Sequence, residues 1–497
     1  MKHPRLTVAA ILLTVAIVLR APQFGNPIAG LDEQYYLLVG TRIWDGAIPY
    51  VDLWDRKPAG LFGLFALIAA LPGNGIVAAQ IVATLFAAAT AFTVALIARR
   101  WAGWVPATMV GIFYLAGLNE LWGETTQTPV FYNLPLALAA LLTLSAPDPT
   151  EPAQRRRAIA AMLHAGVAIQ LKTNAVFEGA FFGIWLLVQA WHSTRSPVAV
   201  ARVAMPLLIA GATPTLIAIT IFAALGHFDA WWQANILSVL AKGASQDAAA
   251  FAHLRDTLVL TAPIVLLALL GLWSRTKRFT VWPPETAFLL GWCAIAIIDL
   301  IAIGGYFPHY ALPLLLAASP LIAHAFAIRR VGPILFVLAM LWPLAHAAIN
   351  LRIAATDRAN AATVLAALPA DVSTQCLYIH EGPVAYYQLT DACLATRYAF
   401  TAHLSSSRES RSLGVDPQTE LSAIAARRPG TILTLSGSTW IDRNLTAEAT
   451  LLSAIRPHYR PVACLPHHHH EPDARLVVWR RNDLAGSTAT INPSCNG

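Results

Sequence analysis

Long apolar stretches, separated by short clusters of charged residues, fill most of the first 350 positions of the chain. An α-helix needs about 20 mainly apolar residues to cross the hydrocarbon core of a bilayer. Stretches that meet or approach this length predict about eleven membrane-spanning helices. They lie near residues 6–19, 75–98, 104–118, 130–146, 157–172, 175–192, 199–225, 257–273, 285–303, 308–328 and 331–350. The pattern is typical of a multi-span α-helical membrane protein.

The basic residues predict how these helices cross the membrane. The first apolar stretch follows a basic N-terminus, as in a signal peptide, but the segment 20–23 is a poor cleavage site, so we interpret the stretch as an uncleaved span with a cytoplasmic N-terminus. Lys and Arg are enriched in cytoplasmic loops. In this orientation the later basic clusters all fall on the cytoplasmic side: Arg99–Arg100, Arg155–Arg157, His192–Arg195, Arg275–Arg278 and Arg329–Arg330. An odd number of spans then places the chain after about residue 350 outside the cytoplasm.

Composition supports the membrane class and explains the net charge. Hydrophobic residues make up 57% of the chain and charged residues only 12%, whereas about a quarter of an average soluble domain is charged. A net charge of +7 would fit nucleic-acid binding, but the basic residues stand beside the apolar stretches, where membrane topology accounts for them. We therefore expect the lipid bilayer as a partner, and no nucleic acid.

The segment 351–497 is more polar than residues 1–350 and forms a second predicted domain. Short β-like runs at 376–379, 431–435 and 476–479 alternate with a helical pattern at 419–428, which predicts a small α/β domain on the periplasmic side. In an exported domain its cysteines can form two disulfides by any of three pairings, and free buried thiols are the alternative. These cysteines are Cys376, Cys393, Cys464 and Cys495.

The first predicted external loop, about residues 21–74, carries an unusual group of charged residues. Asp32 and Glu33 begin an amphipathic helical pattern, and Asp55 and Lys57 precede a short apolar stretch at 61–71 that we expect to lie as a helix in the membrane interface. Such charges are costly at a membrane surface unless they are paired or used. A carboxylate can accept a proton from a hydroxyl, and an ammonium group can bind phosphate. The alternative is that the two aspartates each cap a short helix.

The loop motifs and two later segments resemble a known superfamily. The loop reads Asp-Glu-x-x-Tyr-Tyr from Asp32 and Pro-Tyr-x-Asp-x-x-Asp-x-Lys-Pro from Pro49, and the segments 166–174 and 305–310 follow in the same order, the latter with Pro-His-Tyr. In this order the motifs resemble the GT-C glycosyltransferases, in the branch of the protein O-mannosyltransferases and the aminoarabinose transferase for lipid A. The usual Lys-Pro-Pro reads Lys57-Pro58-Ala59 here. The resemblance covers nearly the whole chain and implies the GT-C fold.

The resemblance implies an inverting transfer from a polyprenyl-phosphate sugar, with the first loop at the reaction centre. By position, the resemblance implies that Asp32 is the catalytic base, or that it binds the acceptor or a metal. Glu33 and Asp55 are further catalytic candidates by the same resemblance. The expected contacts with the donor phosphate are Lys57, Lys172, His309 and Tyr310. For Lys172 the alternative is that its side chain only reaches towards the interface, and for His309 that the ring is structural.

Further residues at the predicted outer face are expected to contact the sugar or the acceptor: Tyr35, Tyr36, Glu124 and Trp231. The alternative for Glu124 is a solvated position at the interface. No metal site is predicted, because the run His467–His470 consists of adjacent residues that cannot all face one ion. Whether the Asp32–Glu33 pair holds a divalent metal stays open.

We therefore expect an inverting glycosyltransferase of the bacterial inner membrane that uses a polyprenyl-phosphate sugar donor and a cell-envelope acceptor, whether lipid, polysaccharide or protein. One alternative is a flippase or transporter of lipid-linked sugars, which would carry ionisable groups near the middle of the bilayer. The other is a ligase or polymerase of surface polysaccharide. For that alternative the functional loop would be the segment 226–256, which contains Trp231.

Overall fold

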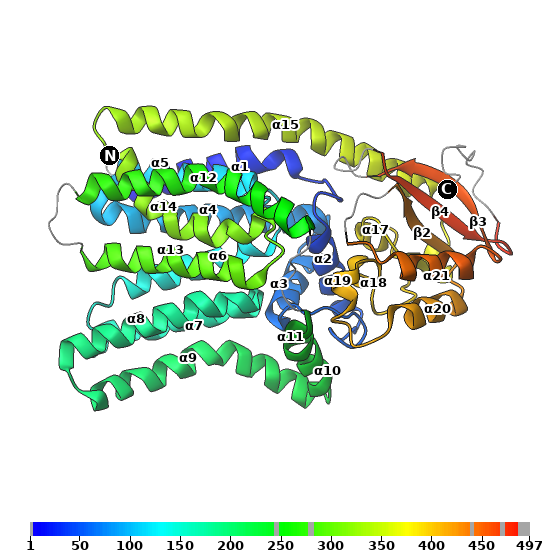
Figure 1. The fold of residues 1–497 in the computed structure, drawn as a ribbon, viewed down its shortest axis with the longest axis horizontal. Helices are drawn as coiled ribbons and strands as arrows, with labels where there is room; N and C mark the ends of the chain where they lie inside the picture. Colours follow the sequence, from blue (N-terminus) through cyan, green and yellow to red (C-terminus); the bar gives the residue numbers. More distant parts are fainter. Residues whose placement is uncertain (1–2, 243–247, 277–282, 438–441, 468–472, 486–497) are drawn as a thin grey trace.

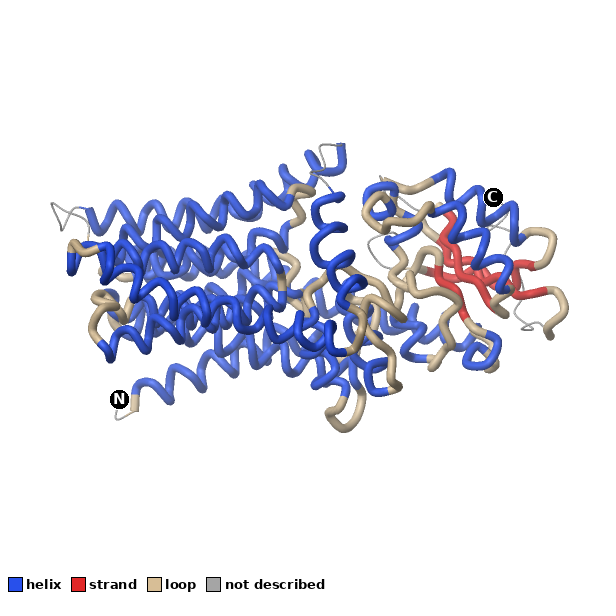
Figure 2. The backbone as a smooth tube through the Cα atoms, turned by 90° about the horizontal axis from the view of Figure 1, so that it is seen from below, coloured by secondary structure: helices blue, strands red, loops and turns tan. Residues whose placement is uncertain are grey.

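The computed structural model describes residues 3–242, 248–276, 283–437, 442–467 and 473–485 of the 497-residue chain. Long helices run side by side in a bundle, and a small domain that contains the β-sheet stands beyond one end of the bundle (Figure 1). The view from below shows the same separation of an all-helical part from the part that carries the strands (Figure 2). The N-terminus lies at the end of the bundle opposite to the small domain.

Each predicted span falls on one helix of the bundle. These helices are α1 (Pro4–Arg20), α4 (Gly75–Ala102), α5 (Trp104–Glu120), α6 (Thr128–Thr143), α7 (Pro152–Leu171), α8 (Val176–Thr194), α9 (Pro197–Ala224), α12 (Ala248–Thr276), α13 (Pro284–Ile303), α14 (Leu312–Phe326) and α15 (Val331–Ala367). Within the described residues, 7 helices are long and apolar enough to cross a membrane by themselves. The others are short, as α5 and α6 are, or include polar residues, such as the arginines near the start of α7. The predicted multi-span helical membrane fold is confirmed.

Apolar side chains on the outside of the bundle show which surface meets lipid. On α9, Leu208, Ile209, Leu216 and Ile217 are each more than half exposed. Patches of this kind would be unstable against water, whereas lipid chains are as apolar as the side chains themselves. Helix α14, by contrast, is almost entirely buried and forms the centre of the bundle.

Short helices cover the end of the bundle that faces the small domain. Helix α2 (Leu31–Trp44) begins with two acidic residues in its first turn, where the positive end of the helix dipole favours them. Helix α3 (Ala59–Ala69) starts after Pro58 and packs on α2, in agreement with the interfacial helix predicted from the sequence. Further turns at this end are η1 (Ala21–Gln23), η2 (Thr173–Ala175), α10 (Phe228–Trp232), η3 (Gln233–Leu237), α11 (Ser238–Lys242) and η4 (Pro308–Ala311).

Helix α15 connects the bundle to the small domain, and the proposed division at residue 350 falls within this helix. The domain's sheet has the order β1-β2-β4-β3, with β1 (Leu377–Ile379) parallel to β2 (Thr431–Ser436) and the other pairs antiparallel. The remaining elements are α16 (Val372–Gln375), α17 (Ala385–Leu389), α18 (Ala402–Ser405), α19 (Ser407–Ser410), α20 (Pro417–Arg427), α21 (Leu445–Ile455), β3 (Tyr459–Pro466) and β4 (Arg475–Arg481). The predicted small α/β domain is confirmed.

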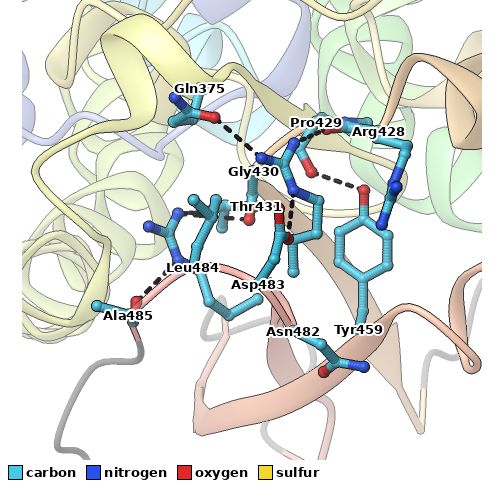
Figure 3. A network of polar contacts seen from close by, with 12 residues as sticks. Gln375, Arg428, Pro429, Gly430, Thr431, Tyr459, Asn482, Asp483, Leu484 and Ala485 are labelled. Atoms are coloured by element: carbon cyan, nitrogen blue, oxygen red, sulfur yellow. Dashed lines mark hydrogen bonds and ion pairs between the residues drawn. The ribbon is translucent and has the colours of Figure 1, made fainter.

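Arginine at the end of β4 fastens the sheet to neighbouring loops. Arg481 donates to Asp483 at 2.7 Å, to the Arg428 carbonyl at 2.5 Å and to Gln375 at 3.2 Å (Figure 3). These contacts tie the turns that precede β1 and β2 to the last strand, so the sheet is held at this end by side chains as well as by its backbone ladder.

Polar and aromatic contacts dock the small domain on the first loop. Arg56 forms an ion pair with Glu409 at 2.6 Å, and the Trp54 amide donates to the Arg397 carbonyl at 2.9 Å. The Tyr35 ring packs on Phe400, with centroids 5.5 Å apart. Because these contacts involve both backbone and buried side chains, the loop and the domain form one continuous structure at the end of the bundle.

A disulfide joins Cys376 to Cys393, as in one of the three possible pairings of the four cysteines. Cys464 is disulfide-bonded as well, Cys495 lies outside the described residues, and Cys293 in α13 is free. The disulfide closes a loop with a sequence separation of 17 residues, which starts immediately before β1 and contains β1 and α17.

Replacing both Cys376 and Cys393 by Ser is expected to lower the free energy of unfolding of the small domain by about 3 kcal/mol, because the unfolded chain loses a constraint on a short loop. Thermal unfolding of the purified protein in detergent measures this change as a lower transition temperature. The matched control is Cys293→Ser, which removes the free thiol. Equal transition temperatures for the double variant and the control would contradict the expectation.

Candidate active site

The side chains of Asp32 and Lys57 meet at the end of the bundle. Asp32 Oδ2 lies 3.6 Å from Lys57 Nζ, and both side chains are partly buried. Burial raises the pKa of Asp32, but Lys57 together with His309, Tyr36 and Lys172 outweighs it and holds the pKa below its usual value. For Lys57, burial acts to lower the pKa, but Asp32 together with Tyr36 and Asp55 raises it well above its usual value. Both groups are therefore charged near neutral pH.

The loop before α3 is shaped so that it presents Lys57. Asp55 Oδ1 accepts hydrogen bonds from the backbone N–H groups of Arg56 and Lys57, at 2.5 and 3.1 Å. The Tyr50 hydroxyl donates a hydrogen bond to the Lys57 carbonyl at 2.8 Å. The ammonium group then lies over the Tyr36 ring, 5.1 Å from its centroid. Asp55 thus holds the turn, and it does not cap α3, whose N-cap residue is Pro58. Asp32 does not cap α2 either, since that N-cap is Gly30.

A second lysine approaches from the end of α7. Lys172 Nζ lies over the Tyr310 ring at 4.4 Å from its centroid, and its charge acts on Asp32. The first turn of α3 packs directly on the last turn of α7, because Gly60 has no side chain: a Cβ there would lie 2.7 Å from Gln170 Cβ. This close approach brings Lys57 and Lys172 to the same place.

The segment before α14 supplies an aromatic wall. The His309 ring lies at 4.5 Å from the Tyr310 ring and at 5.7 Å from Phe307, measured between centroids. The Nδ1 atom of His309 is buried and has no hydrogen-bond partner. Because an unpaired buried nitrogen is uncommon in a stable structure, it marks a position where a ligand atom could bind.

Glu33 points away from Lys57 although it is the neighbour of Asp32. Its carboxylate accepts the Thr125 hydroxyl and, at 3.2 Å, the Thr126 amide, which places it beside Glu124. Burial raises the pKa of Glu33 to about 7. A cavity of about 30 Å³, enough for a single water, adjoins Glu33, Gln34 and Thr126.

Two of the remaining predicted contact residues are enclosed by protein. The Tyr35 hydroxyl donates to the Trp54 carbonyl at 2.9 Å, and Trp231 in α10 is 4% exposed and stacks on Phe228. Tyr36 lies at the site under Lys57, and its hydroxyl is buried with no hydrogen-bond partner. The structure therefore groups Asp32, Tyr36, Lys57, Lys172, His309 and Tyr310, whereas Glu33 and Glu124 form a neighbouring cluster.

Arg20 was not predicted as a site residue from the sequence. It is the last residue of α1, and its side chain is buried. Its guanidinium donates to the carbonyls of Gly123, at 2.6 Å, and Thr125, and to the Thr84 hydroxyl at 3.2 Å. It thus fixes the turn whose Thr125 holds Glu33. A basic residue at the outer end of a first span, opposite to the positive-inside rule, was the signal available in the sequence.

No group of three or more His, Cys, Asp or Glu side chains within the described ranges converges as a metal site would require. Of the histidine run, His467 belongs to the described part of the chain, and residues 468–470 lie outside it.

Neither a family model nor a curated protein matches the chain. Among solved structures, the fold is similar to ArnT from Cupriavidus metallidurans in the apo state, with a TM-score of 0.64, 15% identity and coverage of 95% of this chain and 97% of that chain. ArnT bound to undecaprenyl phosphate gives a TM-score of 0.62 at 16% identity, over 96% and 99% of the two chains. The archaeal oligosaccharyltransferase AglB from Archaeoglobus fulgidus, solved with an inhibitory peptide and a dolichol-phosphate, gives 0.52 at 11% identity, over 94% and 80%.

At these identities the similarity establishes the fold. It extends over nearly all of this chain and of ArnT, including the small C-terminal domain. The GT-C fold that the sequence motifs predict is therefore confirmed.

The raised pKa of Glu33 predicts how stability changes with pH. In the folded protein this pKa is about 7, against an ordinary value of 4.5, so the stability associated with neutral Glu33 is complete below pH 4.5 and is lost as the pH rises through about 7. Glu33→Gln removes this loss of unfolding free energy, which is on the order of 3 kcal/mol. Relative to wild type, its unfolding temperature in detergent is expected to rise between about pH 5 and pH 8.

The matched control is Asp45→Asn, at the exposed far end of α2. Its unfolding temperature should keep a constant offset from wild type across this range. A constant offset for Glu33→Gln as well would show that Glu33 is ionised throughout.

Proposed function

We propose that the protein is an inverting glycosyltransferase that moves a sugar from a polyprenyl-phosphate donor to an acceptor of the cell envelope. The observation that carries the proposal is the Asp32–Lys57 pair at 3.6 Å, beside Lys172 and the unpaired ring nitrogen of His309. A carboxylate suited to accept a proton and cations suited to bind phosphate meet there at one end of a membrane bundle. The GT-C fold, which ArnT shows in a structure with undecaprenyl phosphate, supports this class of donor.

In the proposed reaction, Asp32 accepts the proton of the acceptor hydroxyl while that oxygen attacks the anomeric carbon of the donor sugar. The bond from this carbon to the phosphate oxygen breaks, and its electron pair stays on the phosphate. Because a single displacement occurs on the face opposite to the phosphate, the anomeric configuration inverts. The products are the glycosylated acceptor and polyprenyl phosphate, whose additional negative charge Lys57 and Lys172 stabilise.

The ion pair links donor binding to base strength. In the protein alone, Lys57 holds the pKa of Asp32 below its usual value. A donor phosphate that binds Lys57 brings negative charge close to Asp32 and shares the ammonium group. Both effects raise the proton affinity of the carboxylate. Asp32 would therefore be a stronger base when the donor is present.

The other predicted site residues take supporting positions in this proposal. Asp55 holds the turn that presents Lys57, and Tyr36 and Tyr310 form the surfaces on which the two lysines lie. His309 faces the phosphate with its unpaired nitrogen. Glu33 fixes the start of α2 by its bonds to the loop at Thr125.

For the location we propose the bacterial inner membrane, with the N-terminus in the cytoplasm and the small domain in the periplasm. This orientation agrees with the basic clusters: Arg99–Arg100 lie in the last turn of α4, Arg155–Arg157 near the start of α7 and Arg329–Arg330 after α14, far from the small domain. The disulfide Cys376–Cys393 supports an oxidising compartment for the domain. Residues 1–350 would supply the catalytic membrane domain and 351–497 its periplasmic partner.

The positions of buried carboxylates favour the transferase over a transporter. Glu178 and Asp299 are both fully buried in the bundle, and Asn174 donates to Asp299 at 2.6 Å. Glu178 stands in the first turn of α8, and Asp299 lies four residues before the end of α13 at Ile303. Both therefore belong to the end of the bundle where Lys172 lies, whereas a transport pathway would place such groups near the middle of the helices.

Asp32→Asn is expected to lower the rate of sugar transfer by about 100-fold to 10,000-fold, because the amide cannot accept the proton. Lys57→Ala is expected to weaken donor binding and to slow transfer as well. Membrane vesicles supplied with radiolabelled polyprenyl-phosphate sugars provide the assay, with label in the acceptor fraction as the readout.

The control at matched expression is Asp45→Asn, which changes an exposed carboxylate on the same helix away from the site. It should transfer label as wild type does. Wild-type rates for Asp32→Asn would reject Asp32 as the base, and movement of the intact lipid-linked sugar across the membrane without transfer would favour the transporter alternative.

A further inference from the structure

Arg408 is a half-buried cation of the small domain that has no counter-charge among the described residues. It lies in the short helix α19, at the edge of the domain that faces α2 and α3 (Figure 1). The Nε and Nη2 atoms of its guanidinium are buried and have no hydrogen-bond partner within the part of the chain that the structure describes. A charged group that is removed from water without a partner is costly, so this arrangement calls for an explanation.

Other arginines of the same domain are neutralised. Arg443 binds Glu381 at 3.3 Å and Glu448 at 2.7 Å, and Arg480 binds Asp371 at 2.5 Å. Arg408 has a carboxylate next to it in sequence, Glu409, yet that carboxylate pairs with Arg56 of the first loop at 2.6 Å. Glu409 is therefore engaged by the first loop, and as the next residue on the same short helix it points to a different side from Arg408.

The guanidinium of Arg408 reaches the segment that carries His309 and Tyr310. A Cβ atom placed on Gly305 would lie 2.5 Å from Arg408 Nη1, so the arginine rests directly on the backbone there. Gly305 also has φ +70°, a conformation that favours glycine. The turn is held from behind, because His253 Nδ1 contacts the Gly305 carbonyl at 3.1 Å and the Thr257 hydroxyl donates to the Tyr306 carbonyl at 2.7 Å.

Three cations thus converge from separate parts of the chain. Lys172 lies on the Tyr310 ring at 4.4 Å, and the charges of Lys57 and Arg408 both act on the Tyr310 hydroxyl. Two carboxylates, Asp32 and Glu409, act on the same hydroxyl. Asp32 pairs with Lys57, and Glu409 pairs with Arg56. The remaining guanidinium offers two parallel N–H donors, which fit two oxygens of one phosphate.

We propose that Arg408 is a phosphate-binding residue, which the C-terminal domain contributes to the membrane site and which contacts the lipid-linked phosphate together with Lys57 and Lys172. The inference rests on the proposed function and deepens it, because it gives the small domain a direct part in binding the donor. It also explains why the domain is docked on the first loop: the docking contacts set the distance from α19 to the site.

The test measures binding of radiolabelled undecaprenyl phosphate to the purified full-length protein in detergent. Arg408→Gln is expected to weaken binding by about 10-fold to 100-fold, the range for loss of hydrogen bonds from a buried charged group. Arg408→Lys keeps the charge without the planar fork and should lie between wild type and Arg408→Gln. The matched control is Arg411→Gln, an exposed position one turn away, which should bind as wild type does.

Competition identifies the group that is recognised. Undecaprenol, which lacks the phosphate, should compete equally weakly with the label on wild type and on Arg408→Gln. Inorganic phosphate at the same concentration as the lipid should not displace it, and displacement would overturn the assignment to the lipid-linked group.

The failure of this inference is distinguishable from failure of the proposed function. Equal binding by wild type and by an Arg408→Gln protein with unchanged unfolding temperature would overturn the role of Arg408 alone. So would a variant that binds the carrier lipid normally and shows only a raised KM for the acceptor. If wild type itself does not bind undecaprenyl phosphate, the polyprenyl-phosphate function fails, and the assignment of Arg408 fails with it.

Discussion

Apolar surroundings do not tolerate unpaired charge, and this constraint arranges the whole molecule. In the bundle, backbone groups are satisfied within helices, and the outward faces, such as that of α9, are apolar. Charged side chains gather where helices end. Asp32 lies in the first turn of α2, Lys57 precedes α3, and Lys172 follows α7. The proposed chemistry on a sugar phosphate would therefore take place at such an end, where Asp32, Lys57 and Lys172 lie.

The cost of unpaired charge also distinguishes two kinds of polar side chain: those whose partners lie within the protein, and those that are left available to a substrate. Arg20 is enclosed among carbonyl groups, so its donors are used within the protein. Among the described residues, Lys57 forms an ion pair with Asp32 alone, at a distance that is long for a hydrogen bond, and its side chain remains partly exposed. His309 keeps one ring nitrogen unpaired. Groups of the second kind are the ones that a substrate can bind without first breaking a strong internal contact.

Much of this arrangement could be predicted from the sequence, because it depends on local patterns. The helix expected at 419–428 is observed as α20 (Pro417–Arg427), and the interfacial helix expected at 61–71 is α3 (Ala59–Ala69). Strand β3 was not predicted, since Pro461 and Pro466 interrupt its pattern. Proline is tolerated there because β3 is an edge strand of the sheet. The first loop could be recognised because its charges are close in sequence.

Contacts between residues far apart in the chain could not be predicted. Arg408 lies in the run Ser405-Ser406-Ser407-Arg408-Glu409-Ser410, whose composition is that of a solvated loop. Only the fold brings this run against the first loop, where Arg56 contacts Ser412 across 356 positions of sequence. A site assembled in this way requires the bundle, the loop and the small domain to be folded and docked together. The affinity for a phosphate would then depend on the docking contacts as well as on the lysines, because the ion pair of Arg56 with Glu409 fixes the position of α19, the helix that carries Arg408.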